Sequence, residues 1–158
     1  MKYVEKHLLQ KIIPNLWFNR TAKEAVNFYL NIFSGSKIIS TLNYPKEGLA
    51  SFQQEFAEKV LTIEFEILGQ RLIAINAGDN FKFNEAVSFM IECADQDEID
   101  YYWNKLSASA NSEQCGWCKD KYGLSWQIIP RDMWVFLKNP QSFQKLLNMK
   151  KIIIAELL

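Results

Sequence analysis

An internal repeat constrains the fold of this chain more than any other feature of its sequence. Sliding the chain by about 73 residues lays residues 24–33 over residues 97–106, so that acidic, aliphatic and aromatic positions coincide. A second slide, by about 54 residues, lays residues 69–75 over residues 123–129. The two slides differ because the first half carries a longer polar loop, residues 43–59. Two related units, each too small to bury its own sheet, are therefore expected to pair.

The first half shows the pattern of a strand, a helix and three further strands. Residues 61–67 alternate between apolar and polar positions, which is typical of a strand with one buried face. Thr21 followed by Glu24 forms a capping box and predicts a helix start. The predicted elements are a strand over residues 11–18, a helix from Thr21 to residue 33, and strands over residues 37–42, 60–67 and 71–76.

The same order of elements restarts in the second half. Asp95 with Glu98 marks a second helix start, and Asn139 followed by Pro140 marks another, because proline is favoured in the first turn. The predicted elements are a strand over residues 86–93, a helix to residue 106, strands over residues 114–119 and 124–129, and helix from residue 131 onward.

Charge balance and cysteine content limit the class of protein. Eighteen basic residues balance eighteen acidic ones, whereas binding to nucleic acid or an anionic membrane requires a basic surplus, so neither partner is expected. No apolar run approaches the roughly 18 residues of a membrane-spanning helix, and the N-terminus lacks the apolar core of a signal peptide. Three cysteines fit a reducing compartment better than a disulfide framework. A soluble, cytoplasmic protein is therefore expected.

Segments along nearly the whole chain resemble one protein family. The segments are residues 13–18, 25–33, 81–89, 115–117, 120–130 and 148–158, of which the Phe-Lys-Phe-Asn-Glu and Gly-Leu-Ser-Trp-Gln blocks are the most specific. They resemble the PhnB-like group, often labelled 3-demethylubiquinone-9 3-methyltransferase, of the vicinal oxygen chelate (glyoxalase/bleomycin resistance) superfamily.

The resemblance implies an α+β fold in which two βαβββ modules form an open, cup-shaped mixed sheet around a cavity. The members of the family are usually dimers, so a homodimer is expected. On this chain the fold would be a single domain over residues 1–158. Module one would cover about residues 11–77, module two about residues 85–130, and a C-terminal helical tail residues 131–158.

The methyltransferase label finds no support in the sequence, and no cofactor is expected. A protein that binds S-adenosylmethionine generally has a glycine-rich loop at a strand-to-helix turn. None of the six glycines forms such a cluster.

Metal-dependent relatives take one ligand from the first strand and one from the last strand of each module. Carried over by position, the four places fall at Pro14 or Asn15, at Ile73, at Val87 or Ser88, and at Gln127. Transition metals prefer imidazole, thiolate or carboxylate ligands. The side chains of Gln127 and Asn15 offer only neutral amide oxygens, which are weak ligands, so no metal site is expected.

Other chemically active groups have structural explanations. His7 is the single histidine and lies outside both modules, so a catalytic mechanism that uses a histidine base is not expected. Cys115 and Cys118 form a C-x-x-C without a second pair, and on a strand their thiols would point to opposite faces. Glu64 and Glu66 share a face at strand spacing, which favours a solvated sheet surface over an acid–base pair.

Aromatic residues make up 14% of the chain and supply the walls of the predicted cavity. Neighbouring residues on a strand point to opposite faces, so Gln127 and Trp126 cannot both face the cavity. With Gln127 facing inward, Trp126 packs under the helix. The predicted ligand-binding residues are then Asn15, Trp17, Ser88, Trp117 and Gln127. The alternative is that these aromatic side chains only fill the core.

Three functions remain open from the sequence. The leading hypothesis is a dimeric, metal-independent protein that binds a small organic molecule between aromatic walls. The second is a divalent-metal-dependent isomerase, lyase or dioxygenase of the same superfamily. The third is a structural or regulatory dimer whose cavity is filled. Neither the ligand nor any catalytic residue can be named.

Overall fold

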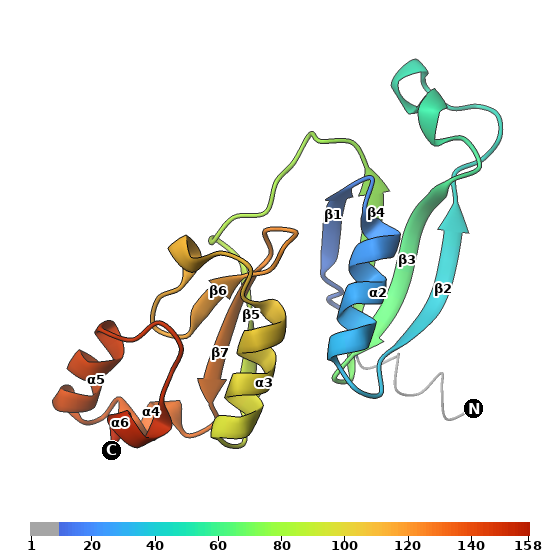
Figure 1. Ribbon diagram of the computed structural model, residues 1–158. Coiled ribbons are helices and arrows are strands. Elements are labelled where there is room, and N and C mark those ends of the chain that lie inside the picture. The colour runs from blue at the N-terminus through green and yellow to red at the C-terminus, as the bar shows by residue number, and fades with distance from the viewer. Residues whose placement is uncertain (1–9) are drawn as a thin grey trace. The chain divides into compact units, whose positions relative to one another are not determined.

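The computed structural model describes residues 10–158. The chain divides into two compact units, unit 1 over Met1–Lys82 and unit 2 over Phe83–Leu158. Each unit contains one open mixed sheet and a helix that packs against it (Figure 1). The α+β class predicted from the sequence is therefore confirmed.

Unit 1 is a four-stranded sheet packed against a helix. Its elements in chain order are β1 (Asn15–Asn19), α2 (Ala22–Ile32), β2 (Lys37–Asn43), the 3-10 helix η1 (Ser51–Phe56), β3 (Val60–Ile67) and β4 (Gln70–Ala77). The strand order is β1-β4-β3-β2, with β1 parallel to β4 and the other neighbours antiparallel. Strand β1 starts only after Pro14, which has no N–H to give to a sheet. The loop over residues 43–59 contains η1, which the sequence did not predict.

Helix α2 forms because its apolar residues recur at helical spacing and bury one face. Its buried residues are Ala22, Ala25, Val26, Tyr29 and Ile32. Tyr29 stacks on Phe65 of β3 with ring centroids 6.3 Å apart, and Phe65 is completely buried. Ile63, Phe65 and Ile67 of β3 are all buried and face the helix, as the alternation predicted, whereas Leu61 is only half-buried.

The start of α2 is capped from the sheet rather than from the helix itself. Thr21 occupies the N-cap position, but its side chain makes no capping hydrogen bond. Instead, the backbone N–H of Ala22 donates to Oδ1 of Asn76 in β4 at 3.2 Å. Nδ2 of Asn76 in turn donates to the Val60 carbonyl at 3.0 Å. The predicted helix start is correct, but the predicted capping box is wrong.

Unit 2 repeats this arrangement with a three-stranded sheet. Its elements are β5 (Ser88–Cys93), α3 (Gln96–Leu106), the 3-10 helix η2 (Ala110–Ser112), β6 (Trp117–Lys119), β7 (Ser125–Pro130), α4 (Met133–Phe136), α5 (Pro140–Leu147) and α6 (Ile154–Leu157). The strand order is β5-β7-β6, with β5 parallel and β6 antiparallel to β7. The Asp95 side chain caps α3 by accepting the Glu98 N–H at 2.9 Å, as the sequence predicted.

The predicted strand over residues 114–119 is shortened by a tight turn. Cys115 and Gly116 have φ values of 51° and 85°, and the flanking Gln114 and Trp117 exchange two backbone hydrogen bonds of 3.1 and 2.7 Å. These dihedral signs are those of a type I′ hairpin turn. The N–H groups of Cys115 and Gly116 donate to carbonyls of the tail, at Met149 and Lys150. Contacts distant in sequence thus fix a turn that local residue pattern does not reveal.

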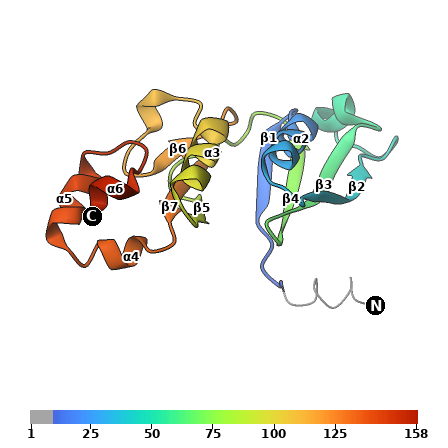
Figure 2. The same ribbon diagram turned by 60° about the horizontal axis from the view of Figure 1, so that its bottom comes forward.

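The C-terminal tail is helical, as predicted, and is an integral part of unit 2. Helices α4, α5 and α6 gather at one side of this unit, with α6 packed against α5 (Figure 2). The side-chain amide of Gln96 in α3 holds the tail with two hydrogen bonds. Its Nε2 donates to the Ile152 carbonyl at 3.0 Å, and its Oε1 accepts a hydrogen bond from the Ile154 N–H at 2.8 Å. The buried Ser142 hydroxyl donates to the Leu157 carbonyl at 2.7 Å.

The sequence repeat corresponds to a repeat of topology. In each unit the strand before the helix is parallel to the last strand, β1 with β4 and β5 with β7. In each unit the preceding strand, β3 or β6, is antiparallel to that last strand. Unit 2 has one strand fewer in its sheet because the segment before β6 pairs with it only through the single Gln114–Trp117 bridge. The cup enclosed by both modules together stays a prediction.

None of the helices that the structure describes could span a membrane. Over residues 10–158 every helix is too short or too polar to cross a bilayer.

Candidate functional site

Each sheet has one face against its helix and an opposite face, which we call the open face. In unit 2 the helix face carries Ile91 of β5 and Trp126 and Ile128 of β7, all buried. The Trp126 indole packs against Phe89 and donates through Nε1 to the Asp120 carboxylate at 2.9 Å. Because Gln127 has the opposite parity, it belongs to the open face. The sequence prediction for this pair of neighbours matches the structure.

The open face of unit 2 presents two rows of side chains across its three strands. In one row, Ser125 of β7 lies between Ser88 of β5 and Lys119 of β6. In the other row, Gln127 lies between Met90 and Trp117. Nε2 of Gln127 donates to the Ser88 hydroxyl at 2.8 Å and so joins the two rows. Three predicted ligand-binding residues, Ser88, Trp117 and Gln127, therefore lie on one surface.

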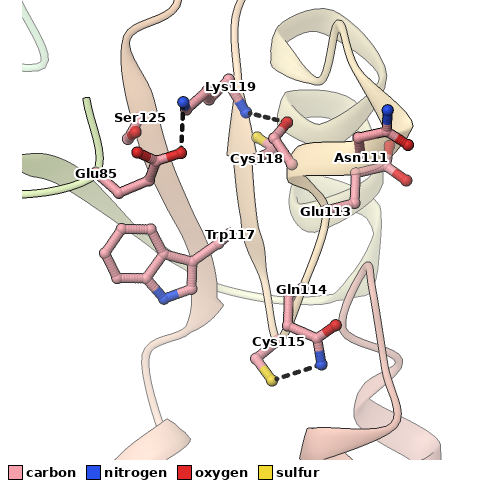
Figure 3. A pocket seen from close by; sticks show the side chains of 10 residues that line it. Glu85, Asn111, Glu113, Gln114, Cys115, Trp117, Cys118, Lys119 and Ser125 are labelled. Atoms are coloured by element: carbon pink, nitrogen blue, oxygen red, sulfur yellow. Dashed lines mark hydrogen bonds and ion pairs between the residues drawn. The ribbon is translucent and has the colours of Figure 1, made fainter. Parts of the chain in front are cut away.

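A pocket of about 490 Å³ lies over this open face and the adjoining loop. In Figure 3 the Trp117 indole lies beneath Glu85, and the Ser125 hydroxyl lies beside the Glu85–Lys119 ion pair. The lining residues are Glu85, Asn111, Ser112, Glu113, Gln114, Cys115, Trp117, Cys118, Lys119 and Ser125. The pocket thus combines one large aromatic surface with several hydrogen-bonding groups.

Ser125 is the unusual member of this pocket. Its side chain is 1% exposed, and its hydroxyl makes no hydrogen bond in the part of the chain that the structure describes. An unsatisfied buried polar group costs about 1–3 kcal/mol. Sequence reasoning missed Ser125, although it shares the parity of Gln127 and belongs to the same Gly-Leu-Ser-Trp-Gln block.

Lys119 and Glu85 form an ion pair at the rim of the pocket. The hydrogen bond from Lys119 lowers the pKa of the Glu85 carboxyl, so the carboxylate form is favoured. The Lys119 amine nitrogen is in turn paired with the Glu85 carboxylate rather than with the Ser125 hydroxyl. The pair can therefore position polar groups of a ligand, but it does not activate the hydroxyl.

The two cysteines of the C-x-x-C lie in different surroundings. Cys118 is buried on the helix face, where burial raises the pKa of its thiol to about 12 and keeps the thiol protonated. Cys115 is half-buried in the turn, where its sulfur accepts a hydrogen bond from Nε2 of Gln114 at 3.4 Å. Cys115 lies in a turn and not on the predicted strand, so the argument from opposite strand faces was wrong for this residue.

The open face of unit 1 holds the other two predicted ligand-binding residues. Asn15 is exposed, and its amide donates to the nearby Ile13 carbonyl at 3.0 Å. Trp17 is half-buried; its Nε1 donates to the Gly78 carbonyl at 2.8 Å. Trp17 lines a pocket of about 420 Å³, whereas Asn15 does not. The structure therefore gives Trp17 a place in a pocket of its own unit.

Three polar side chains on this open face bond to one another. Glu64 forms an ion pair with Arg71 and also accepts a hydrogen bond from the Ser40 hydroxyl at 3.1 Å. A carboxylate held in this way serves the sheet surface rather than an acid–base pair with Glu66.

The residues at the four ligand places of the metal-dependent relatives do not fit a metal ion. Ile73, which pairs with Asn15 in the sheet, carries no donor atom. The amides of Asn15 and Gln127 already donate to protein oxygens. Within residues 10–158, no group of three His, Cys, Asp or Glu side chains could hold a metal ion. His7 lies outside the described residues.

The strand-to-helix turns do not fit a methyl-donor nucleotide either. The turn after β1 is Arg20-Thr21 and the turn after β5 is Ala94-Asp95, and neither contains glycine. Backbone N–H groups at such turns need glycine to approach a bound nucleotide closely. No chemical step through S-adenosylmethionine follows from these residues.

Comparison with known proteins places the chain in a family. A family model for 3-demethylubiquinone-9 3-methyltransferase matches residues 10–129. A solved structure of a PhnB protein from Bacillus cereus, described by that same enzyme name, is 32% identical, with a TM-score of 0.60 over 76% of this chain and 99% of that one. A protein from Pseudomonas aeruginosa is 16% identical, with a TM-score of 0.58 over 77% of this chain and 98% of that one, and shows the fold alone.

None of the curated proteins compared with the chain matches it. The family match, residues 10–129, covers the sheet of unit 1 and nearly all of the sheet of unit 2. The similarity to the Bacillus cereus protein extends over three quarters of the chain. The chain therefore belongs to the PhnB-like, 3-demethylubiquinone-9 3-methyltransferase family, with its glyoxalase-like fold.

Proposed function

We propose that this protein binds a small, ring-containing organic molecule on the open face of unit 2, without a metal ion. The observation that carries this proposal is the buried Ser125 hydroxyl, which lacks a partner among residues 10–158 and lines the pocket. Because this hydroxyl is buried, the ligand would first displace the Glu85–Lys119 ion pair beside it, and its hydrogen bond to Ser125 would then remove the cost of the unsatisfied group.

The surroundings of Ser125 fit such a ligand. Trp117 offers an aromatic surface, and its indole N–H makes no hydrogen bond within residues 10–158. Lys119, directly opposite Ser125 in the sheet, offers an ammonium group, and Glu85 offers a carboxylate. The volume of about 490 Å³ falls in the range of ligand pockets, roughly 300–1,000 Å³.

The same groups favour binding over turnover. A nucleophilic serine needs an adjacent base. The neighbouring Lys119 is paired with Glu85 instead of Ser125, and no imidazole occurs in residues 10–158. Ser125 therefore acts in this proposal as a hydrogen-bonding anchor for the ligand.

The proposal is tested by titrating chelator-treated protein with benzamide and with toluene while following the Trp117 indole resonance by NMR. Benzamide should bind several-fold more tightly than toluene because only the amide can bond Ser125. Ser125→Ala should remove that preference. The matched control is Ser142→Ala, whose buried hydroxyl is already bonded to the Leu157 carbonyl and lies away from the pocket. Equal binding of the two compounds, or no effect of Ser125→Ala, would contradict the proposal.

The divalent-metal enzyme and the homodimer are tested separately. Elemental analysis of protein purified without chelator should show well under one metal per chain, and about one per chain would favour the enzyme. We propose that the protein is a homodimer in the cytoplasm, and light scattering coupled to gel filtration checks the dimer.

A further inference from the structure

A second pocket, of about 420 Å³, lies in unit 1 between the ends of β1 and β4 and the 3-10 helix η1. It is lined by Trp17, Arg20, Tyr44, Phe52, Gln53, Glu55, Phe56, Leu61, Ile75, Ala77, Gly78, Asp79 and Asn80. Four of these side chains are aromatic rings, which is a high share for a pocket of this size. The sequence placed only Trp17 in a binding site, because the loop that carries the other rings has no periodic pattern.

Three of the four rings are held in fixed positions. The Trp17 indole donates to the Gly78 carbonyl at 2.8 Å and makes a T-shaped contact with Phe81 at 4.9 Å. Tyr44 stacks on Phe56 with ring centroids 5.3 Å apart, and its hydroxyl donates to the Asn76 carbonyl at 2.8 Å. The rings therefore form rigid walls that need little reordering when a ligand enters.

The fourth ring, Phe52, is 77% exposed although it lines the pocket. An exposed phenylalanine on a 3-10 helix gains little from the fold of its own chain. A ligand in the pocket would cover one face of this ring and reduce its contact with water.

The pocket already holds one cation against an aromatic face. The Arg20 guanidinium lies 5.4 Å from the centroid of the Phe56 ring and bonds to Glu55 at 2.5 Å. Aromatic faces attract cations through their quadrupole. This contact shows that the walls of the pocket suit a positive group when a carboxylate lies nearby.

The residues that line the pocket include one guanidinium and two carboxylates. Arg20 is paired with Glu55. Asp79 makes no hydrogen bond or ion pair within the described residues 10–158, although its charge also acts on Arg20. The lining therefore carries a net negative charge at neutral pH. A neutral or anionic ligand would gain nothing from this charge, and a cation would.

We infer that the pocket of unit 1 is a site for a small organic cation of the quaternary ammonium class. The methylated ammonium group would lie against the faces of Trp17 and Phe52, with Asp79 as the counter-ion. This site is separate from the one proposed in unit 2, and neither proposal depends on the other.

The experiment compares choline with 3,3-dimethyl-1-butanol, a neutral molecule of nearly the same shape. Binding is followed by NMR of the full chain through the indole N–H resonance of Trp17, with that of Trp117 as the reporter for unit 2. Choline should shift the Trp17 resonance and bind about tenfold more tightly than the neutral compound. Added salt should weaken choline binding and leave the neutral compound unaffected.

Two variants separate the aromatic and the charge contributions. Asp79→Asn should weaken choline binding about fivefold and leave the neutral compound unchanged. Phe52→Leu keeps an apolar side chain but removes the ring, and should weaken choline binding about threefold or more. Glu47→Gln is the control for the loss of a negative charge. Glu47 is an exposed carboxylate in the loop that carries Phe52, and it does not line the pocket.

Three results would overturn the inference. They are equal affinity for the charged and the neutral compound, choline shifts at Trp117 without shifts at Trp17, and no saturable choline binding at all. One-dimensional NMR spectra of the two variants serve as the folding control. If these spectra are unaltered, a loss of choline binding reports a change in the site and not unfolding. Benzamide binding in unit 2 should be unchanged in both variants.

Discussion

The open faces of the two units share a topology but differ in how their polar groups are satisfied. In unit 1, Glu64 is paired with Arg71 and Ser40, and the Trp17 indole N–H is bonded to Gly78. In unit 2, the buried hydroxyl of Ser125 has no partner within the described residues. The repeat thus fixes the backbone, while the side chains of each open face are free to serve a different purpose.

Thiol chemistry sharpens this comparison most, because all three cysteines lie in unit 2. Cys93 and Cys118 are buried, whereas Cys115 is half-buried in a turn. In the native protein at pH 8, iodoacetamide should label Cys93 and Cys118 about 1000-fold or more slowly than Cys115, because the buried thiols react only after opening of the unit. Peptide mass spectrometry over time measures the three rates, and equal rates at all three would show that unit 2 is open.

The same thiols predict a loss of stability at high pH. Burial raises the pKa of Cys93 and Cys118 from 9.0 to about 12, so the folded chain keeps protons that the unfolded chain releases. The contribution is complete below pH 9 and is lost as the pH rises toward 12. Urea midpoints at pH 8 and pH 10.5 test the sign. Replacing both cysteines by alanine should flatten the slope, and a slope that is unchanged would contradict this cause.

Two type I′ turns within residues 10–158 allow a matched test of backbone strain. Leu68–Gly69 in unit 1 and Cys115–Gly116 in unit 2 have positive φ at both positions. A Cβ on Gly116 would lie 2.7 Å from Cδ1 of Ile152 and 2.9 Å from the Ile128 carbonyl, whereas a Cβ on Gly69 meets nothing within 4 Å. Gly116→Ala should therefore cost about 3 kcal/mol and Gly69→Ala about 1 kcal/mol. Urea unfolding measures both, and equal losses would mean that the tail does not pack on the turn.

Equivalent aromatic substitutions compare the two pockets. Trp17→Phe removes a hydrogen bond to the Gly78 carbonyl, whereas the Trp117 indole N–H has no such bond within residues 10–158. The first variant should therefore lose about 1 kcal/mol more of unfolding free energy than the second. Trp117→Phe should in turn weaken benzamide binding, which Trp17→Phe should leave intact. A larger stability loss in Trp117→Phe, or weaker benzamide binding in Trp17→Phe, would contradict the distinction between the two open faces.

The sequence predicted those parts of the fold that depend on local pattern. Strand β3 has the predicted bounds because strict alternation identifies a half-buried strand. The turn at Cys115 and Gly116 could not be predicted, because its hydrogen-bonding partners come from residues 149 and 150. The cap on α2 was missed for the same reason, since Asn76 lies far along the chain.

The candidate site was predicted in part. Parity on β7 correctly placed Gln127 on the face opposite Trp126. The predicted residues Ser88, Trp117 and Gln127 share the open face of unit 2, but of these only Trp117 lines the pocket. Ser125 could have been added by the same parity argument, but its lack of a partner depends on three-dimensional packing. Glu85 precedes β5, and nothing in its surrounding sequence indicates the ion pair with Lys119.

The free energy of unfolding of two serine variants tests the central claim most directly. Ser125 and Ser142 are both buried in unit 2, but only the Ser142 hydroxyl has a hydrogen-bond partner among residues 10–158. In urea unfolding without ligand, Ser125→Ala should raise stability by about 1 kcal/mol, and Ser142→Ala should lower it by about 1 kcal/mol. Equal destabilisation by both variants would show that the Ser125 hydroxyl is already satisfied in the free protein, and would contradict its role as a ligand anchor.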